Sequence, residues 1–433
     1  MKISRELSAS SILQVIRTGF ERISDHRAAN AKVDLTDALM SGFAMFSLKD
    51  SSLLEFDRRR ITDINLKAIY GLKIIPCDTQ MRTILDPVSP DNLKPLFKDV
   101  VEQLRQAQVL ARLQFRGHYL VSLDGSGYFS STKVHCASCL EKKSRKTGEV
   151  TYAHQALVGV IVHPDIKEVI PLAPEPIIKQ DGETKNDCER NAAKRFFSQL
   201  RQDYPEWPFI ITEDALSANA PHLQELHQHN LRYILGVKEG DHAFLFEYVK
   251  TAHPAGQTTE YECKVKGVIH RFRFINQVPL NASHPDLLVN FIEYWEIDGN
   301  KERHFCWITD FTVTTANVFE LMRGGRARWK IENETFNTLK NQGYHFEHNY
   351  GHGQQFLSVN LALLMLLAFL VDQVQQLAST LFQAVLKKEG NRKQLGEHVR
   401  ALFYTLPFTS LEEIFSALLY GYQVEKVVIL GPA

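Results

Sequence analysis

The sequence has few cysteines and no excess of charge of either sign, and both facts exclude classes of protein. Six cysteines are scattered through 433 residues and only Cys136 and Cys139 are near neighbours, which excludes a disulfide-rich scaffold and favours a reducing compartment. Lys and Arg total 50, as do Asp and Glu, so the formal net charge is zero. Proteins that bind nucleic acids usually carry a basic excess, so this balance counts mildly against such a partner, although clustered basic residues can still supply the contacts.

Long apolar runs and two common catalytic motifs are also missing. The first residues, MKISRELSAS, lack the apolar run of a signal peptide, and the most apolar segment, residues 361–371, is shorter than the ~20 residues that span a bilayer. We therefore expect a cytoplasmic protein without membrane contact, in which residues 361–371 form part of a buried helix. The sequence contains no GxxxxGK[ST] phosphate loop and no GxSxG elbow, so we expect neither a nucleotide cofactor nor a serine hydrolase.

The apolar spacing of the sequence changes near residue 116. Residues 1–115 repeat the three-to-four-residue spacing of amphipathic helices, whereas short apolar runs alternate with helical stretches from residue 116 onward. Such alternation favours an α/β architecture. We predict strands at 118–124, 154–164, 167–177, 207–212 and 231–240, helices at 183–204 and 220–230, and a polar, basic loop at 125–151.

The order of these elements is that of an RNase H-like core, a mixed five-stranded sheet in which three antiparallel strands are followed by two parallel ones. The last core helix is displaced, because residues 256–310 intervene with short β-type runs; we predict this helix to begin after Gly324-Gly325 and to end near Gly343. The predicted division is a helical N-terminal region (1–115), the first part of the core (116–255), a β-rich insertion (256–312), the last core helix (313–354) and a C-terminal helical region (355–433).

Three acids lie where this fold would bring them together. Asp124 closes the first predicted strand, Asp214 closes the fourth, and Glu332 lies on the last core helix. The two strands are neighbours in such a core, so the three carboxylates can hold two Mg²⁺ ions, with Mn²⁺ as a substitute, for phosphodiester chemistry. An isolated Asp after a strand is more often a turn or helix cap, and Glu213 is a rival to its neighbour Asp214.

The segment around Glu332 resembles the DDE transposases of bacterial insertion sequences. The branch with a β-rich insertion in an RNase H-like core carries the motif Tyr-x2-Arg-x3-Glu-x6-Lys. Arg328 and Glu332 match its Arg-x3-Glu portion. Gly325 occupies the tyrosine position and Leu339 the lysine position, with Lys340 one residue later. One residue turns a side chain by ~100° around a helix axis, so this lysine departs from the pattern.

The resemblance implies cut-and-paste movement of DNA. The expected partners are the terminal inverted repeats of the element and a target DNA, held by a homodimer in a synaptic complex. Residues 1–115 would bind the repeats and the C-terminal helices would pair the subunits. Related enzymes release flanking DNA through a hairpin, aided by a tryptophan of the insertion; Trp295 and Trp307 are candidates, or else core aromatics. Two alternatives remain: an inactive DNA-binding descendant of such an enzyme, and a structure-specific nuclease with the same core.

Basic residues cluster at two places that suit phosphate contacts, although charged runs are also common on solvated surfaces. One cluster begins the last core helix and the other follows Asp124 in the predicted basic loop. We expect the DNA-binding residues to be Arg323, Arg326, Arg328, Lys330, Lys340, Lys142, Lys143 and Arg145.

A possible metal site other than the three acids begins at His135. The spacing His135-Cys136-x2-Cys139 resembles half of a zinc site, with His154 or His163 as distant partners, but the second CxxC pair of a standard site is missing. The sequence alone therefore leaves zinc binding open.

Overall fold

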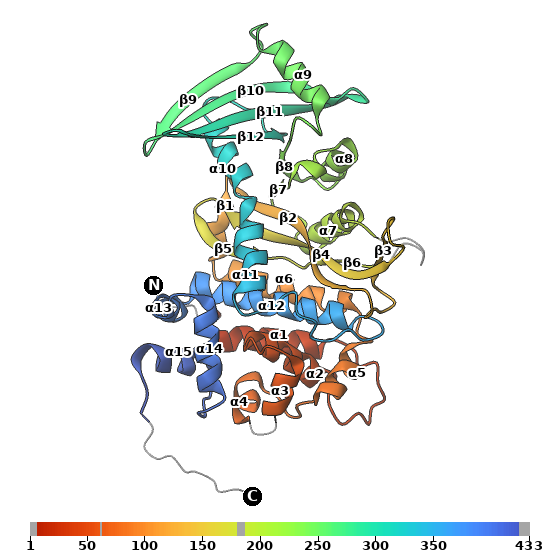
Figure 1. Ribbon diagram of the computed structural model, residues 1–433. Coiled ribbons are helices and arrows are strands. Elements are labelled where there is room, and N and C mark those ends of the chain that lie inside the picture. The colour runs from red at the N-terminus through yellow and green to blue at the C-terminus, as the bar shows by residue number, and fades with distance from the viewer. Residues whose placement is uncertain (1–6, 61–62, 180–186, 424–433) are drawn as a thin grey trace, which may run out of the picture. The chain divides into compact units, whose positions relative to one another are not determined.

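The computed structural model describes residues 7–60, 63–179 and 187–423, which form two compact units (Figure 1). The first unit contains residues 1–109 and 338–433, and the second contains residues 110–337. The predicted N-terminal and C-terminal helical regions therefore belong to the same compact unit, and the predicted sheet lies in the other.

The first unit consists of helices that bury apolar faces against one another. Helix α1 (Ala9–Glu21) begins where the Ser8 side chain accepts a hydrogen bond from the Ser11 amide, and it buries Ile12 and Phe20. The other helices are α2 (Leu35–Ser47), α3 (Leu53–Arg59), α4 (Ile64–Tyr70), α5 (Asp78–Leu85), α6 (Lys94–Gln106), α12 (Leu357–Ala378), α13 (Thr380–Glu389), α14 (Arg392–Phe403) and α15 (Leu411–Tyr420).

Helix α12 contains the apolar segment 361–371. It packs against α2 and, less extensively, against α6. In the described part of the chain it is the one helix that is long and apolar enough to cross a membrane, and 94% of its most apolar stretch is buried inside the protein. The prediction of a buried helix is confirmed, and the helix extends on both sides of the apolar run.

The second unit is built on a twelve-stranded mixed sheet in the order β3-β4-β2-β7-β8-β12-β11-β10-β9. Strands β2 (His118–Ser131) and β4 (Val150–His163) are antiparallel, and β5 (Ile166–Pro171) and β6 (Glu175–Ile177) pair with β4. Strand β7 (Phe209–Thr212) is parallel to β2, and β8 (Arg232–Gly236) is parallel to β7. The short strands β1 (Gln114–Phe115) and β3 (Leu140–Lys143) pair with β2 and β4. The predicted α/β class is confirmed.

Helices α7 (Glu189–Asp203) and α8 (Ala220–Gln228) follow β6 and β7 in the chain. The apolar side of α7 lies on β4, where Gly159 makes room for Phe196: a Cβ at Gly159 would lie 2.3 Å from the Phe196 ring. Residues 183–186 of the predicted helix lie outside the described residues. The match between the apolar stripe of α7 and the buried strand fixes the helix against the sheet.

The predicted β-rich insertion is an antiparallel extension of the same sheet. Its strands are β9 (Thr259–Val265), β10 (Val268–Asn281), β11 (His284–Asp298) and β12 (Lys301–Thr309), with α9 (Ala243–Ala252) packed on β10. Strand β12 pairs with β8, so the insertion continues the hydrogen-bonded ladder of the core (Figure 1). The insertion is thus anchored one strand away from β7.

One local prediction was wrong and a second was right only in part. Residues 125–151 are not one loop, because β2 continues to Ser131 and β3 and the start of β4 follow. The helical segment that carries Glu332 begins after Gly324-Gly325, as predicted, but the glycines are not a break, because α10 (Val318–Arg326) contains both of them and a turn at 327–328 separates the two helical segments. A Cβ at Gly324 would lie 2.9 Å from Ile234, and one at Gly325 would lie 2.4 Å from the Trp307 indole. These glycines allow close packing of a helix; they do not end one.

Candidate active site

Asp124 lies within strand β2 and not at its end. Strand β7 pairs with β2 only as far as Ser122 and Thr212, and Asp124 and Asp214 each follow two residues later. After β7 ends, β2 continues because β4 still pairs with its other edge. The prediction that the strands before Asp124 and Asp214 are neighbours in the sheet is confirmed. The prediction that Asp124 ends its strand is wrong.

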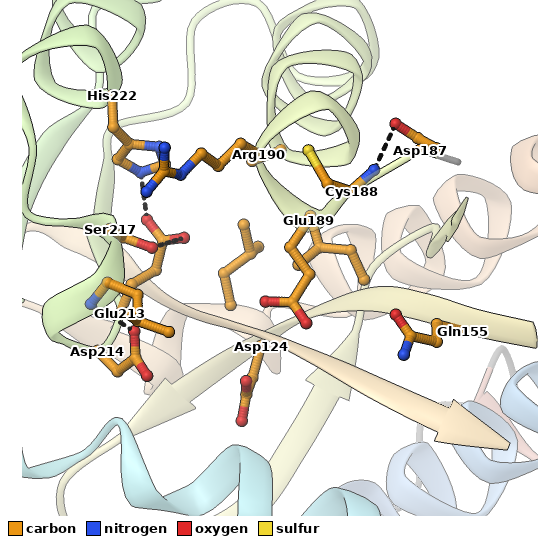
Figure 2. A pocket seen from close by; sticks show the side chains of 14 residues that line it. Asp124, Gln155, Asp187, Cys188, Glu189, Arg190, Glu213, Asp214, Ser217 and His222 are labelled. Carbon is orange, nitrogen blue, oxygen red and sulfur yellow. Dashed lines mark hydrogen bonds and ion pairs between the residues drawn. The ribbon is translucent and has the colours of Figure 1, made fainter. Parts of the chain in front are cut away.

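Two adjoining pockets bring the three predicted acids to one region of the second unit. The first, of about 510 Å³, is lined by Asp124, Asp214 and Glu189 among others (Figure 2). The second, of about 530 Å³, is lined by Asp214, Glu332 and Arg328 among others. Asp214 and its neighbour Glu213 line both pockets, so the two pockets adjoin at the turn after β7.

Asp214 and its rival Glu213 are held differently. Asp214 Oδ1 accepts a hydrogen bond from the Leu216 amide at 3.0 Å and so caps a short 3₁₀ turn, Ala215–Ser217. Glu213 turns toward His222, with 2.6 Å between Glu213 Oε2 and His222 Nε2 (Figure 2). Burial by itself lowers the pKa of His222, but the charge and hydrogen bond of Glu213 raise it. Glu213 is therefore engaged in an internal ion pair, while one carboxylate oxygen of Asp214 has no part in the cap.

Glu332 lies in a π-helical turn, η5 (Ile331–Phe336), which continues into α11 (Asn337–Asn341). The turn packs against β2, β4 and β5. The Ser122 hydroxyl on β2 donates to the Arg328 carbonyl at 3.0 Å, and the Arg328 guanidinium lies 2.9 Å from Glu332 Oε1. Arg328 and Glu332, which match the Arg-x3-Glu portion of the motif, thus form an ion pair. π-Turns occur often at functional sites, where they redirect a side chain.

The electrostatic environment of Asp124 is that of a carboxylate cluster. Burial raises the pKa of Asp124 to about 6; the Arg328 charge opposes this, and the charges of Glu332 and Glu189 add to it. The pKa of Glu189 is also raised, by burial and then by Asp214 and Glu213. Among the described residues, the oxygens of the three predicted acids do not all lie within 4.8 Å of one another. The raised pKa of Asp124 thus reflects burial and the charges of two acidic neighbours, and carboxylate oxygens are the type of donor that Mg²⁺ prefers.

Mg²⁺ should stabilise the protein more at neutral than at acidic pH. Since the folded-state pKa of Asp124 is raised from 3.8 to about 6, its contribution to stability is complete below pH 3.8 and is lost as the pH rises through about 6. Mg²⁺ at these acids would offset this loss, so we expect it to raise the unfolding midpoint by a few degrees near pH 7.5 and hardly at all near pH 5.

The matched control for this measurement is Asp124→Asn, which keeps the shape of the side chain and removes its charge. It should remove most of the Mg²⁺ effect in thermal unfolding followed by circular dichroism. An equal Mg²⁺ effect at both pH values would contradict this assignment.

Sequence reasoning missed two residues of the region. Glu189 begins α7, and its carboxylate packs so closely on Gly125 that a Cβ there would lie 2.3 Å away. Trp329 is 46% exposed, lines the second pocket and lies under the Arg328 guanidinium at 4.8 Å. The sequence does not mark Glu189 as a site residue, because a glutamate in the first turn of a helix is common and is stabilised there by the helix dipole. The sequence likewise gives no sign that Trp329 is exposed beside a pocket, because helical spacing alone does not show which side chains the fold leaves uncovered.

The predicted DNA-binding residues fall into two groups. Lys142, Lys143 and Arg145 are exposed on the hairpin that joins β3 to β4. The others make internal contacts: Arg323 pairs with Asp165, Arg326 with Glu296 at 3.4 Å, and Lys330 donates to the Ile166 carbonyl at 2.7 Å. Lys340, in the first unit, pairs with Glu347 at 2.7 Å.

The two tryptophans of the insertion differ. Trp307 is buried, and its indole covers Gly325. Trp295 stacks on His304 with ring centroids 5.0 Å apart, and the Arg273 guanidinium lies 5.4 Å from its ring. Of the two, Trp307 serves as a core aromatic.

Comparison with known proteins adds no relative. No model of a known protein family matches the chain, and a search of curated proteins found no match either.

Proposed function

We propose that this protein is the DNA transposase of an insertion sequence, with Asp124, Asp214 and Glu332 as a Mg²⁺-binding DDE triad. The observation that carries the proposal is that the three acids line two adjoining pockets and that the charge of Glu332 contributes to the raised pKa of Asp124. They come from β2, from the turn after β7 and from η5, which are far apart in the sequence, and they line two pockets that share Asp214.

The sheet order supports an RNase H-like core. Read from β5 through β4, β2, β7 and β8, three antiparallel strands are followed by two parallel ones. The acids lie near the carboxyl ends of the paired segments of β2 and β7, the edge at which such sheets bind ligands. The antiparallel strands β9 to β12 come before the acid-bearing η5, as in the transposase branch that the sequence resembles.

Each residue has a distinct task in this proposal. The three carboxylates would hold Mg²⁺, which supplies Lewis-acid charge and an activated water or 3′-hydroxyl for phosphodiester cleavage and joining. Arg328 holds the Glu332 carboxylate in place through its 2.9 Å ion pair. Trp329 offers an exposed ring on which a DNA base can stack beside the pocket. The basic residues of the β3–β4 hairpin offer phosphate contacts.

A structure-specific nuclease would use the same three acids, so the products distinguish the two functions. The test is incubation of the protein with labelled duplexes that end in its own element's terminal sequence, together with a plasmid target. We expect cleavage at the element end with Mg²⁺ or Mn²⁺, little with Ca²⁺, and joining of precut ends to the plasmid on a denaturing gel.

The three possible results separate the candidates. Joined products support transposition, and cleavage without joining favours the nuclease. Specific binding of the ends with neither reaction, in any of the three cations, would favour an inactive DNA-binding descendant and would overturn the proposal.

A further inference from the structure

Two cysteines and a histidine of the second unit meet beyond Asp124 along the β2–β4 ladder. Cys136 and Cys139 lie in the segment between β2 and β3, and His154 lies on β4 opposite Phe129 of β2. The two Sγ atoms are 3.8 Å apart, and His154 Nε2 lies 3.4 Å from each of them. Three atoms that are common transition-metal ligands thus form a nearly equilateral triangle.

The size of this triangle is that of one face of a zinc tetrahedron. With Zn–S near 2.3 Å and Zn–N near 2.0–2.1 Å, tetrahedral angles place two sulfurs about 3.8 Å apart and a sulfur and a nitrogen about 3.6 Å apart. The observed separations of 3.8, 3.4 and 3.4 Å agree with these values to about 0.2 Å. A thiolate pair with an imidazole is a soft donor set that favours Zn²⁺ and excludes Mg²⁺.

The surroundings hold the three side chains in this arrangement. Cys139 and His154 are almost completely buried, at 1% and 0% exposure. The Cys136 amide donates to Cys139 Sγ at 3.4 Å, a contact that stabilises a metal-bound thiolate. The Tyr128 ring stacks on the His154 imidazole with an interplanar angle of 10° and so fixes its orientation.

We propose that Cys136, Cys139 and His154 are three ligands of a structural Zn²⁺ ion, with the fourth position filled by a further donor. Binding releases the thiol protons to solvent. The ion would join the segment before β3 to β4, and so fix the hairpin that carries Lys142, Lys143 and Arg145. That hairpin pairs over only four residues of β3, and a hairpin so short is marginally stable by itself.

Two alternatives compete with zinc at Cys136, Cys139 and His154. The first is a disulfide between the two cysteines, which would leave the imidazole without a role as a ligand. The second is a metal site at Glu293, His304 and Cys306, whose ligand atoms also lie within 4.8 Å of one another. There, however, His304 is largely exposed and its 3.0 Å ion pair with Glu293 accounts for the proximity without a metal.

The experiment is elemental analysis of the purified full-length chain, expressed with zinc and dialysed against metal-free buffer. We expect about one zinc ion per chain. X-ray absorption should show two sulfur ligands near 2.3 Å and nitrogen or oxygen ligands near 2.0–2.1 Å, and Co²⁺ exchange should produce thiolate charge-transfer absorption. These measurements use the wild-type chain, so they stand even where a ligand variant fails to fold.

Variants then assign the ligands. Cys136→Ser, Cys139→Ser and His154→Asn should each lower zinc affinity by at least roughly 100-fold. Cys188→Ser and His304→Asn, which lie outside the cluster, should retain the ion. Asn replacement of each remaining histidine in turn identifies a fourth ligand of that type.

Four results would overturn the zinc site: a zinc-free chain that takes up no Zn²⁺ or Co²⁺, a Cys136–Cys139 disulfide in the freshly purified protein, zinc that is lost with His304→Asn, or zinc that is retained in all three ligand variants. This site is independent of the proposed DNA chemistry. A chain that holds zinc but does not cleave DNA, or the reverse, would reject one proposal and leave the other standing.

Discussion

We expect Asp124→Asn, Asp214→Asn and Glu332→Gln each to lower the proposed Mg²⁺-dependent cleavage of element ends by roughly 10³-fold or more, while binding of those ends persists. A metal ion supplies several kcal/mol of transition-state stabilisation, and about 4 kcal/mol corresponds to three powers of ten in rate. Each substitution removes one negative charge and changes almost no volume. The rate is measured with a labelled duplex on a denaturing gel, and binding with a mobility shift in Ca²⁺.

Asp214→Asn is the most discriminating of the three. The Leu216 amide is capped by Asp214 Oδ1, and an asparagine side chain oxygen caps equally well. Loss of cleavage with an unchanged unfolding midpoint therefore assigns the charge of Asp214 to the reaction and excludes a purely structural role.

The matched control is Glu213→Gln, one residue earlier in the chain. Because Glu213 pairs with His222, we expect this variant to lower stability and to keep most of the cleavage rate. Full cleavage by Asp214→Asn together with no cleavage by Glu213→Gln would move the second ligand to Glu213. Full cleavage by all three acid variants would end the DDE proposal.

Gly325→Tyr, which restores the motif tyrosine, unfolds or strongly destabilises the second unit. A Cβ at this position would lie 2.4, 2.7 and 2.8 Å from three atoms of the Trp307 indole, which is itself buried. Overpacking of this kind costs about 1–3 kcal/mol for an added methyl, and more for a ring. Chemical denaturation followed by tryptophan fluorescence measures the effect.

A second substitution tests the cause. Trp307→Ala leaves room next to the helix, so Gly325→Tyr should be far less destabilising in that background than in the wild type, with a coupling of about 1–3 kcal/mol. Gly240→Ala is the control, because a Cβ there meets nothing within 4 Å. Additive effects of the two changes would show that Trp307 does not fill the place of the motif tyrosine.

This packing gives a physical reason for one departure from the transposase motif. Space that a tyrosine would occupy on the helix is filled by a tryptophan from β12. The other departure is the lysine, which follows Glu332 by one residue more than the motif requires. The π-helical turn that contains Glu332 holds one residue more than an α-helical turn. The extra residue of the π-turn thus lies in the same segment as the extra residue between Glu332 and Lys340.

Apolar periodicity and chain order were enough to predict the class of the fold. The segments that form β2, β4, β5, β7 and β8 each contain a short apolar run, and helices α7 and α8 show regular apolar spacing. The local sequence pattern and the burial of these segments in the fold therefore agree. The parallel neighbourhood of β2 and β7 followed from the order of the elements. Asp124 and Asp214 follow two of these apolar runs, whereas Glu332 was predicted from the last core helix and from its match to the Arg-x3-Glu motif.

Contacts between segments that are distant in the sequence determine the length of β2 and the course of helix α10. Strand β2 passes Asp124 because β4 continues to pair with it, and helix α10 runs through two glycines because Trp307, Ile234 and Phe115 pack against them. The local sequence predicts neither feature. A pair of glycines usually indicates the end of a helix, and only the side chains that pack against this pair in the fold explain why α10 contains it.

The Cys136, Cys139 and His154 cluster shows the same limit most clearly. Sequence spacing placed two cysteines in one turn and left the histidine fifteen residues away, with His163 as an equal candidate. The pairing of β2 with β4 places His154, and not His163, next to the two sulfurs. The register of the strands, and not the distance along the chain, determines which histidine reaches them. Composition and periodicity determine which elements form and which faces are apolar; only the folded chain decides which polar groups share a site, since that depends on register, packing and the space between side chains.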